Sequence, residues 1–200
     1  MASAHASKRV HASLVTIISA SRLPISAIFL ALALDPSEKL KKLSLVVLLI
    51  LLVTDIVDGL LARRWDVTSD FGYILDGVAD RASYLASLLI LNATVDLSIL
   101  VVYIVILRDI LLYALRALHP TWSQSIPESR INAKINAVML RLLLAFGFFS
   151  FYSTIWNVNV HFLPTHKDLL LAWNIGWVSY AFLAYWLLWR SYRLYLSSRT

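Results

Sequence analysis

Residues 54–84 read T-D-I-V-D-G-L-L-A-R-R-W-D-V-T-S-D-F-G-Y-I-L-D-G-V-A-D-R-A-S-Y. Four carboxylates of this stretch, those of Asp55, Asp58, Asp76 and Asp80, lie inside or at the edge of two strongly apolar segments. Burying a charge in such a segment is costly unless another group pairs with it. An ionisable residue at such a position therefore indicates a functional site.

The spacing of the four aspartates predicts that they lie on two helix faces. Asp55 and Asp58 are three residues apart, and Asp76 and Asp80 are four apart. Because each residue of a helix turns by about 100°, residues at these separations share a face. We expect the two faces to meet in the folded protein.

Carboxylates that face one another in a low-dielectric site repel, and divalent cations remove that repulsion. Oxygen ligands suit Mg²⁺ or Mn²⁺, and two such ions can bind both phosphates of a pyrophosphate and stabilise the leaving oxygen. Gly59 and Gly72 lack side chains where a ligand or a neighbouring helix approaches closely. Arg63, one turn beyond Gly59, can bind a phosphate bidentately. A site of this kind provides what a phosphoryl-type transfer mainly needs, which is positioning and charge stabilisation.

The pattern D-x2-D-G-x2-A-R-x8-G-x3-D-x3-D fits this stretch without insertion or deletion over 26 residues. It resembles the signature of the CDP-alcohol phosphotransferase family, integral membrane enzymes that make phospholipids. Eight residue types at fixed spacing make this signal highly specific. The eight positions are Asp55, Asp58, Gly59, Ala62, Arg63, Gly72, Asp76 and Asp80.

The resemblance implies a role for each of these positions. It implies that two divalent ions, Mg²⁺ or Mn²⁺, are held by the four aspartates, and that Asp80 is also the general base that deprotonates the acceptor hydroxyl. It implies attack of an alcohol on the β-phosphorus of a CDP-linked lipid, with release of CMP. The positions that would bind the CDP group are Asp58, Gly59, Ala62, Arg63 and Gly72.

Composition indicates an integral membrane protein of one domain, residues 1–200. The chain is 60% hydrophobic and 15% charged, whereas soluble domains are about 25% charged. A net charge of +6 would also suit a nucleic-acid partner, but the basic residues lie at the ends of apolar segments. A membrane surface and anionic phosphate substrates explain them better. There is no cysteine, so disulfides and thiolate metal sites are excluded.

Six apolar segments approach the roughly 20 residues that a membrane-spanning helix needs. We predict an all-α bundle of six transmembrane helices with a polar active-site cavity that faces the cytoplasm. Residues 1–12 are expected to form a cytoplasmic tail, Pro36 and Ser37–Lys42 a loop, and Asn92–Asp96 a turn. The predicted helices are about 13–34, 43–63, 71–93, 97–118, 134–156 and 169–189.

The distribution of basic residues predicts the orientation of the bundle. The predicted loops and helix ends on one side carry 11 lysines and arginines, and those on the other side carry four. The positive-inside rule then places both termini and the loop between the second and third helices in the cytoplasm. All four aspartates would lie near the cytoplasmic ends of their helices, where a soluble head group reaches them.

Three further basic residues are candidates for binding the acceptor. Arg108 and Arg116 frame the stretch R-D-I-L-L-Y-A-L-R and share a helix face, which suggests an anionic acceptor. This stretch resembles one found after the signature in phosphatidylglycerophosphate synthases of the family. Lys134, in N-A-K-I-N-A, instead resembles a K-x-N run of the cardiolipin synthases. In the first apolar run, Thr16 and Arg22 match the family's T-x-x-R region only loosely.

These patterns are most similar to a phosphatidyltransferase that uses CDP-diacylglycerol and glycerol 3-phosphate to make phosphatidylglycerophosphate. Cardiolipin synthesis from phosphatidylglycerol, or transfer to an inositol phosphate, are the enzymatic alternatives. A cation transporter lined by the four aspartates would not explain the fixed glycine, alanine and arginine positions, and a membrane scaffold explains still less. The resemblance also implies a homodimer among membrane lipids, without a nucleic-acid partner.

Overall fold

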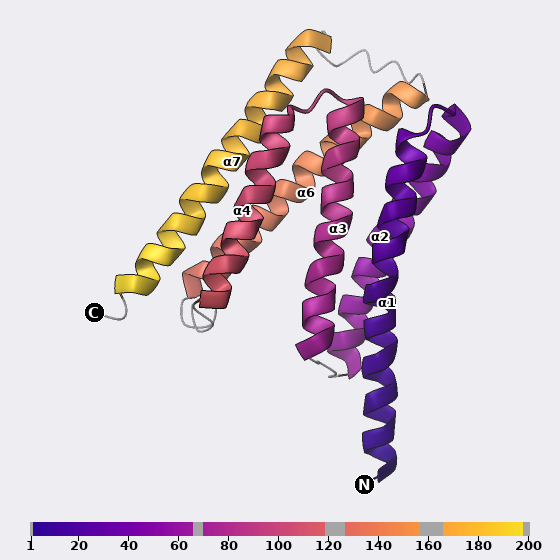
Figure 1. Ribbon diagram of the computed structural model, residues 1–200, viewed down its shortest axis with the longest axis vertical. Coiled ribbons are helices and arrows are strands. Elements are labelled where there is room, and N and C mark those ends of the chain that lie inside the picture. The colour runs from indigo at the N-terminus through magenta and orange to yellow at the C-terminus, as the bar shows by residue number, and fades with distance from the viewer. Residues whose placement is uncertain (1, 66–69, 119–126, 157–165, 198–200) are drawn as a thin grey trace. The chain divides into compact units, whose positions relative to one another are not determined.

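The computed structural model describes residues 2–65, 70–118, 127–156 and 166–197, and all the regular secondary structure in these ranges is α-helix. Continuous apolar runs without strand-like alternation favour helices, because a helix satisfies its own backbone hydrogen bonds. Figure 1 shows these elements in chain order. They are α1 (Ala2–Leu34), α2 (Glu38–Trp65), α3 (Asp70–Thr94), α4 (Ile99–Leu118), α6 (Pro127–Ile155) and α7 (His166–Ser197).

Helix α1 begins at Ala2, whereas the sequence predicted a helix from about residue 13, so the predicted helix start was wrong. The cytoplasmic location of the residues before 13 stays a prediction. The segment contains several alanines and neither glycine nor proline, so nothing in it stops a helix. His11 then lies within α1 and stacks on Trp65 near the end of α2, with ring centroids 4.4 Å apart. This contact joins the N-terminal half of α1 to the C-terminal end of α2.

The loop expected at Ser37–Lys42 is also mostly helix, because α2 begins at Glu38. The backbone amide of Ser37 donates to Asp35 Oδ1 at 2.7 Å, and the Ser37 carbonyl accepts from the amide of Lys41 at 3.0 Å. Glu38 lies in the first turn, where a negative charge suits the helix dipole, and pairs with Lys42 at 3.4 Å. The charged residues of this segment therefore belong to the first turns of a helix and not to a loop.

Four helices contain stretches long and apolar enough to cross a membrane, judged over the described residues. This supports an α-helical, multi-pass membrane protein. Spanning by α3 and α4, the cytoplasmic side of the termini and the polar cavity stay predictions. The four stretches are His11–Leu34, Glu38–Leu61, Lys134–Ile155 and Leu171–Ser197.

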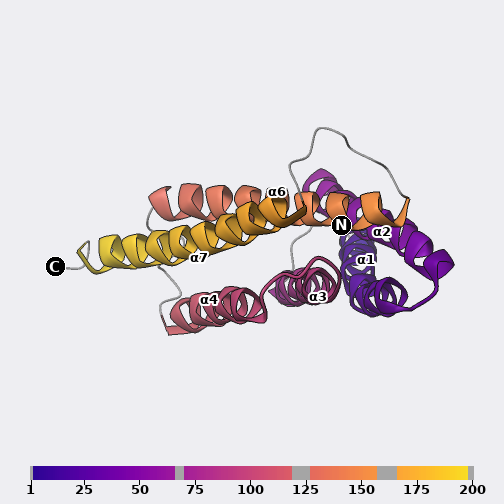
Figure 2. The ribbon, with the colours of Figure 1, turned by 90° about the horizontal axis from the view of Figure 1, so that it is seen from above.

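The chain divides into two compact units, Met1–Ile90 and Leu91–Thr200, with the boundary inside α3. In the first unit α1 and α2 form an antiparallel pair, and α3 lies beside α1 when the helices are viewed end-on (Figure 2). In the second unit α7 packs against both α4 and α6. The first unit contains all four aspartates of the signature.

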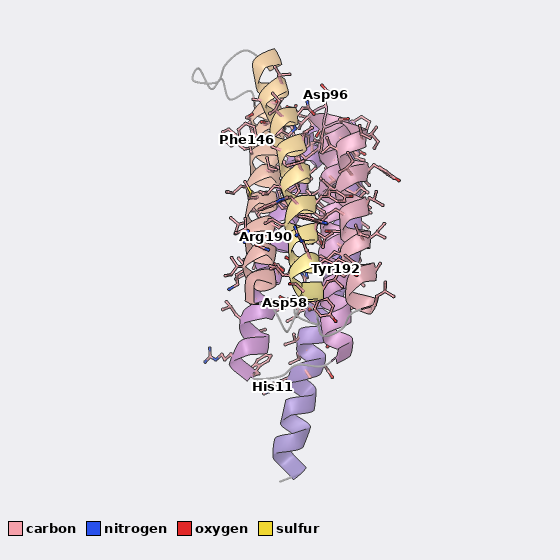
Figure 3. All side chains as sticks on the ribbon, turned by 90° about the vertical axis from the view of Figure 1, so that its left-hand side faces the viewer. His11, Asp58, Asp96, Phe146, Arg190 and Tyr192 are labelled. Carbon is pink, nitrogen blue, oxygen red and sulfur yellow. The ribbon has the colours of Figure 1, made fainter. Side chains whose placement is uncertain are left out.

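Helix packing in the second unit depends on aromatic residues at helical spacing along α7. Trp173 and Trp177 meet edge-on with centroids 5.6 Å apart, and Trp177 and Tyr180 do the same at 5.8 Å. All three side chains are buried. Phe146 of α6, labelled in Figure 3, packs on Trp173 with ring centroids 5.4 Å apart, so these aromatic contacts join α6 to α7.

The turn between α3 and α4 follows from one residue with a left-handed backbone. Asp96 has a φ of 51°, a conformation that aspartate tolerates better than most residues. The turn buries Leu97, whose amide donates to the Leu91 carbonyl at 3.3 Å. Asn92 closes it by donating its side-chain amide to the Leu97 carbonyl. The predicted turn at Asn92–Asp96 is thus observed slightly later in the chain.

Gly147 of α6 should be the glycine of the second unit least able to accept a methyl group. A Cβ there would lie 2.7 Å from the Trp173 ring and 2.8 Å from Leu91 Cδ1, whereas a Cβ at Gly176 would meet only Leu143 at 3.5 Å. Gly147→Ala should therefore destabilise the protein by about 1–3 kcal/mol. Gly176→Ala is the matched control. Thermal unfolding in detergent measures both, and equal midpoints for the two variants would contradict the packing described here.

Candidate active site

One buried arginine lies at the centre of the four aspartates of the signature. Arg22 of α1 donates from Nη1 to Asp55 Oδ1 at 2.9 Å, and its Nη2 lies 2.9 Å from Asp58 Oδ2. The same two nitrogens also form hydrogen-bonded ion pairs with Asp80 and Asp76, respectively. A single guanidinium therefore contacts carboxylates from both helix faces, and the two faces do meet as their spacing predicts.

Three helices supply this cluster, and each does so through local helical spacing. Helix α2 contributes Asp55 and Asp58 from adjacent turns, and α3 contributes Asp76 and Asp80 one turn apart. Helix α1 contributes Arg22 and, three residues earlier on the same face, Ser19. The Ser19 hydroxyl donates to Asp58 Oδ2 at 3.0 Å, so Asp58, labelled in Figure 3, is held from α1 by two side chains.

The cluster has a buried side and an accessible side. The Arg22 side chain is 2% exposed, and that of Asp58 is 6% exposed. The side chains of Asp55, Asp76 and Asp80 are 41%, 45% and 52% exposed. The guanidinium thus lies beneath a layer of carboxylates, three of which a solute can reach.

The charges of the cluster do not balance. Four ionised aspartates contribute −4 and Arg22 contributes +1, which leaves −3 among the contacting groups. Surplus negative charge next to apolar helices is unfavourable unless further cations approach it. The site therefore has an electrostatic preference for cationic ligands on its accessible side.

The donor set fits divalent ions chemically, since aspartate oxygens are the ligands that Mg²⁺ and Mn²⁺ prefer. The guanidinium, however, stands where the carboxylates converge. Over the described residues, no group of three or more acidic or histidine side chains is arranged around a point that a metal ion could take. Asp55, Asp58, Asp76 and Asp80 would hold such an ion after turning away from Arg22.

The remaining residues of the signature lie between Asp58 and Asp76 in the sequence. Gly59 and Gly72 lie in α2 and α3 and are partly buried. Ala62 and Arg63 belong to the last turn of α2, but their side chains lie outside the described set. The predicted contribution of these four residues to CDP binding stays a prediction.

The three residues predicted to bind the acceptor all belong to the second unit. Arg108 of α4 is buried, and its Nη1 donates to the neighbouring Asp109 Oδ1 at 2.8 Å. Its Nε has no hydrogen-bond partner among the described residues. Lys134 of α6 is exposed, and the side chain of Arg116 lies outside the described set. Their role at the acceptor stays a prediction.

Arg22 is the residue whose importance the sequence analysis missed. It matched Arg22 with Thr16, but the Thr16 hydroxyl donates to the Ala12 carbonyl of its own helix at 2.9 Å. The residue that acts with Arg22 is Ser19, at the three-residue separation of a T-x-x-R pattern with serine in place of threonine. A usable signal was present, because an arginine inside an apolar helix needs an anionic partner. The neighbouring apolar helices offer four.

The geometry agrees with the family comparison. A family model for CDP-alcohol phosphatidyltransferases matches residues 9–189. The chain belongs to the CDP-alcohol phosphatidyltransferase family. Comparison with curated proteins and with solved structures finds no match.

Membership makes this protein a membrane transferase of phospholipid synthesis. Members of the family transfer phosphatidyl groups from CDP-alcohol substrates to alcohol acceptors and generally depend on divalent metal ions. The match extends over both compact units and includes Arg22 as well as the signature aspartates.

Ser19→Ala should weaken the hold of α1 on Asp58. The variant loses a hydrogen bond to a charged, buried group, which contributes about 1.5–3 kcal/mol. Ser21→Ala is the matched control, because the Ser21 hydroxyl donates to the Ile18 carbonyl of its own helix. Thermal unfolding in metal-free buffer should show a lower midpoint for Ser19→Ala only. An unchanged midpoint would mean that this hydrogen bond does not hold the cluster.

Proposed function

We propose that this phosphatidyltransferase transfers the phosphatidyl group of CDP-diacylglycerol to glycerol 3-phosphate, forming phosphatidylglycerophosphate and CMP with the help of two Mg²⁺ or Mn²⁺ ions. The observation that carries the proposal is the convergence of the four signature aspartates on one point, with three of them accessible. Family membership supplies the reaction type, and the residues supply the details that follow.

The donor side of the site consists of the four aspartates and of the signature residues between Asp58 and Asp76. Asp55, Asp58, Asp76 and Asp80 would hold the two divalent ions, which when bound neutralise the pyrophosphate and stabilise the leaving oxygen. Ser19 keeps Asp58 oriented through its 3.0 Å hydrogen bond.

The CDP group would bind next to these carboxylates. Gly59 and Gly72 would let it approach the backbones of α2 and α3 closely. Arg63 would bind a phosphate of the donor bidentately. Asp58 and Ala62 complete the set of CDP-binding residues that we propose.

Asp80 would act as the general base. The acceptor hydroxyl gives its proton to the Asp80 carboxylate while its oxygen bonds to the β-phosphorus of CDP-diacylglycerol. The bond from that phosphorus to the bridging oxygen breaks, and CMP leaves with the electron pair. Asp80 is the most exposed of the four aspartates, with 52% of its side chain accessible, which suits a group that must meet the acceptor.

The acceptor assignment depends on Arg108, Arg116 and Lys134, three basic residues of one unit. Guanidiniums favour phosphate groups, and glycerol 3-phosphate carries a phosphate monoester of higher charge than a lipid diester. Cardiolipin synthesis, with phosphatidylglycerol as acceptor, is the second candidate, because of the K-x-N run at Lys134. We further propose that both termini and the site lie on the cytoplasmic side, as the charge asymmetry of the loops favours. A homodimer is proposed from the family resemblance alone.

An acceptor screen with labelled CDP-diacylglycerol tests this function. Purified protein should release CMP only with an acceptor, with glycerol 3-phosphate preferred over phosphatidylglycerol and an inositol phosphate. Chelation should abolish release, and Mg²⁺ or Mn²⁺ should restore it, because the four carboxylates must be neutralised. Full activity in metal-free buffer would contradict the metal dependence, and a different preferred lipid product would contradict the acceptor.

Two aspartate variants should separate chemistry from donor binding. Asp80→Asn removes the base, so turnover should fall roughly 10²-fold or more with a smaller change in CDP-diacylglycerol binding. Asp55→Asn should weaken donor and metal binding together. Asp96→Asn is the matched control, because Asp96 lies in the turn between α3 and α4 and asparagine tolerates its positive φ. Equal losses of donor binding in the Asp55 and Asp80 variants would refute the separate roles.

A further inference from the structure

We propose that Arg22 is a resident counter-ion of the acidic cluster, which holds the four carboxylates together without metal and competes with divalent cations for them. The inference rests on the proposed metal-dependent function and assigns to one residue the control of how tightly the metal binds. It starts from the observation that both terminal nitrogens of Arg22 are shared among all four carboxylates.

The first argument concerns the metal-free protein. Without a cation, the like charges of Asp55, Asp58, Asp76 and Asp80 would push α2 and α3 apart. Arg22 reduces the sum of charges from −4 to −3 and bridges the two helices directly. Its side chain is 2% exposed and that of Asp58 is 6% exposed, so water screens the pair between these two groups poorly. Arg22 therefore takes part of the structural role that a bound cation would otherwise have.

The second argument concerns charge balance with metal present. Two divalent cations contribute +4, which neutralises the four aspartates without any help from Arg22. A guanidinium that kept its place would then add an unneeded positive charge beside two dications, which repel it. The carboxylates can be fully paired with the cations or with Arg22, and the two arrangements exclude each other energetically.

The third argument is geometric. Each aspartate directs one carboxylate oxygen to the guanidinium. Among the described residues, no three acidic side chains are arranged so that they could hold a metal ion between them. Bound cations would need those same oxygens. Asp55, Asp76 and Asp80 are about half exposed, so their carboxylates can turn from the buried guanidinium to an ion that arrives from solvent.

By this proposal Arg22 weakens metal binding while it stabilises the metal-free protein. We expect the wild-type protein to remain folded in chelator and to bind Mn²⁺ reversibly. Replacing Arg22 should reverse both properties. If Arg22 only stabilised the fold, its replacement would misplace the carboxylates and so lower the affinity for metal. The sign of the change in affinity therefore separates competition from a merely structural role.

The test titrates Mn²⁺ into the full-length protein in detergent and follows free Mn²⁺ by electron paramagnetic resonance. Arg22→Gln, purified with Mg²⁺ and then exchanged, should bind Mn²⁺ roughly tenfold more tightly or better than wild type. In chelator its unfolding midpoint should fall well below that of wild type, and saturating Mn²⁺ should restore it. Arg22→Lys keeps the positive charge but lacks the two terminal nitrogens of the guanidinium, so its affinity for Mn²⁺ should be intermediate.

Arg81→Gln is the matched control for net charge. Arg81 follows Asp80 directly, but its Nη1 donates to the Gly77 carbonyl of its own helix. Its removal should change Mn²⁺ affinity much less than removal of Arg22. Mn²⁺ binding by wild type with equal or weaker binding by both Arg22 variants would overturn the counter-ion role and leave the proposed function intact. No Mn²⁺ binding by any of the proteins would overturn the metal-dependent function itself.

Discussion

The structure of the first unit depends on neutralising charge inside apolar helices. A buried guanidinium or carboxylate without a partner costs several kcal/mol, and removing one partner of a buried pair typically costs about 3–5 kcal/mol. The chain places Arg22 in α1, two aspartates in α2 and two in α3, and the ion pairs that form among them join different helices. Each helix position is therefore coupled to the other two. The same requirement that holds the helices together also creates the acidic site.

The site is polarised, which connects the fold to the chemistry. Arg22 and Asp58 are buried, and Ser19 donates a hydrogen bond to Asp58, whereas the other three aspartates are accessible to solvent. The contacts of the buried Arg22 hold the four carboxylates close together, while Asp55, Asp76 and Asp80 remain accessible to ligands. Transfer of a phosphatidyl group needs a site of this kind, because positioning and charge stabilisation account for most of the catalysis.

Sequence alone predicted the family and the position of the four aspartates on two helix faces that meet, because these follow from a fixed motif and local periodicity. It did not predict their common partner, since a contact between Arg22 and residues at least 33 positions away depends on how α1 packs on α2 and α3. Helix ends were also missed: alanine-rich residues before residue 13 continued α1, and Glu38 and Lys42 paired within α2 instead of forming a loop. Charged residues next to an apolar segment were taken to lie outside the helix. Helical propensity and capping instead extended the helix over them.

The most direct measurement of the central claim is the anomalous scattering of Mn²⁺ in crystals of the full-length protein. The account predicts Mn²⁺ peaks within bonding distance of Asp55, Asp58, Asp76 and Asp80, with the Arg22 guanidinium no longer at the point where these carboxylates converge. Crystals grown at an Mn²⁺ concentration that supports CMP release, but with all four aspartates still paired to Arg22 and no peak among them, would contradict it.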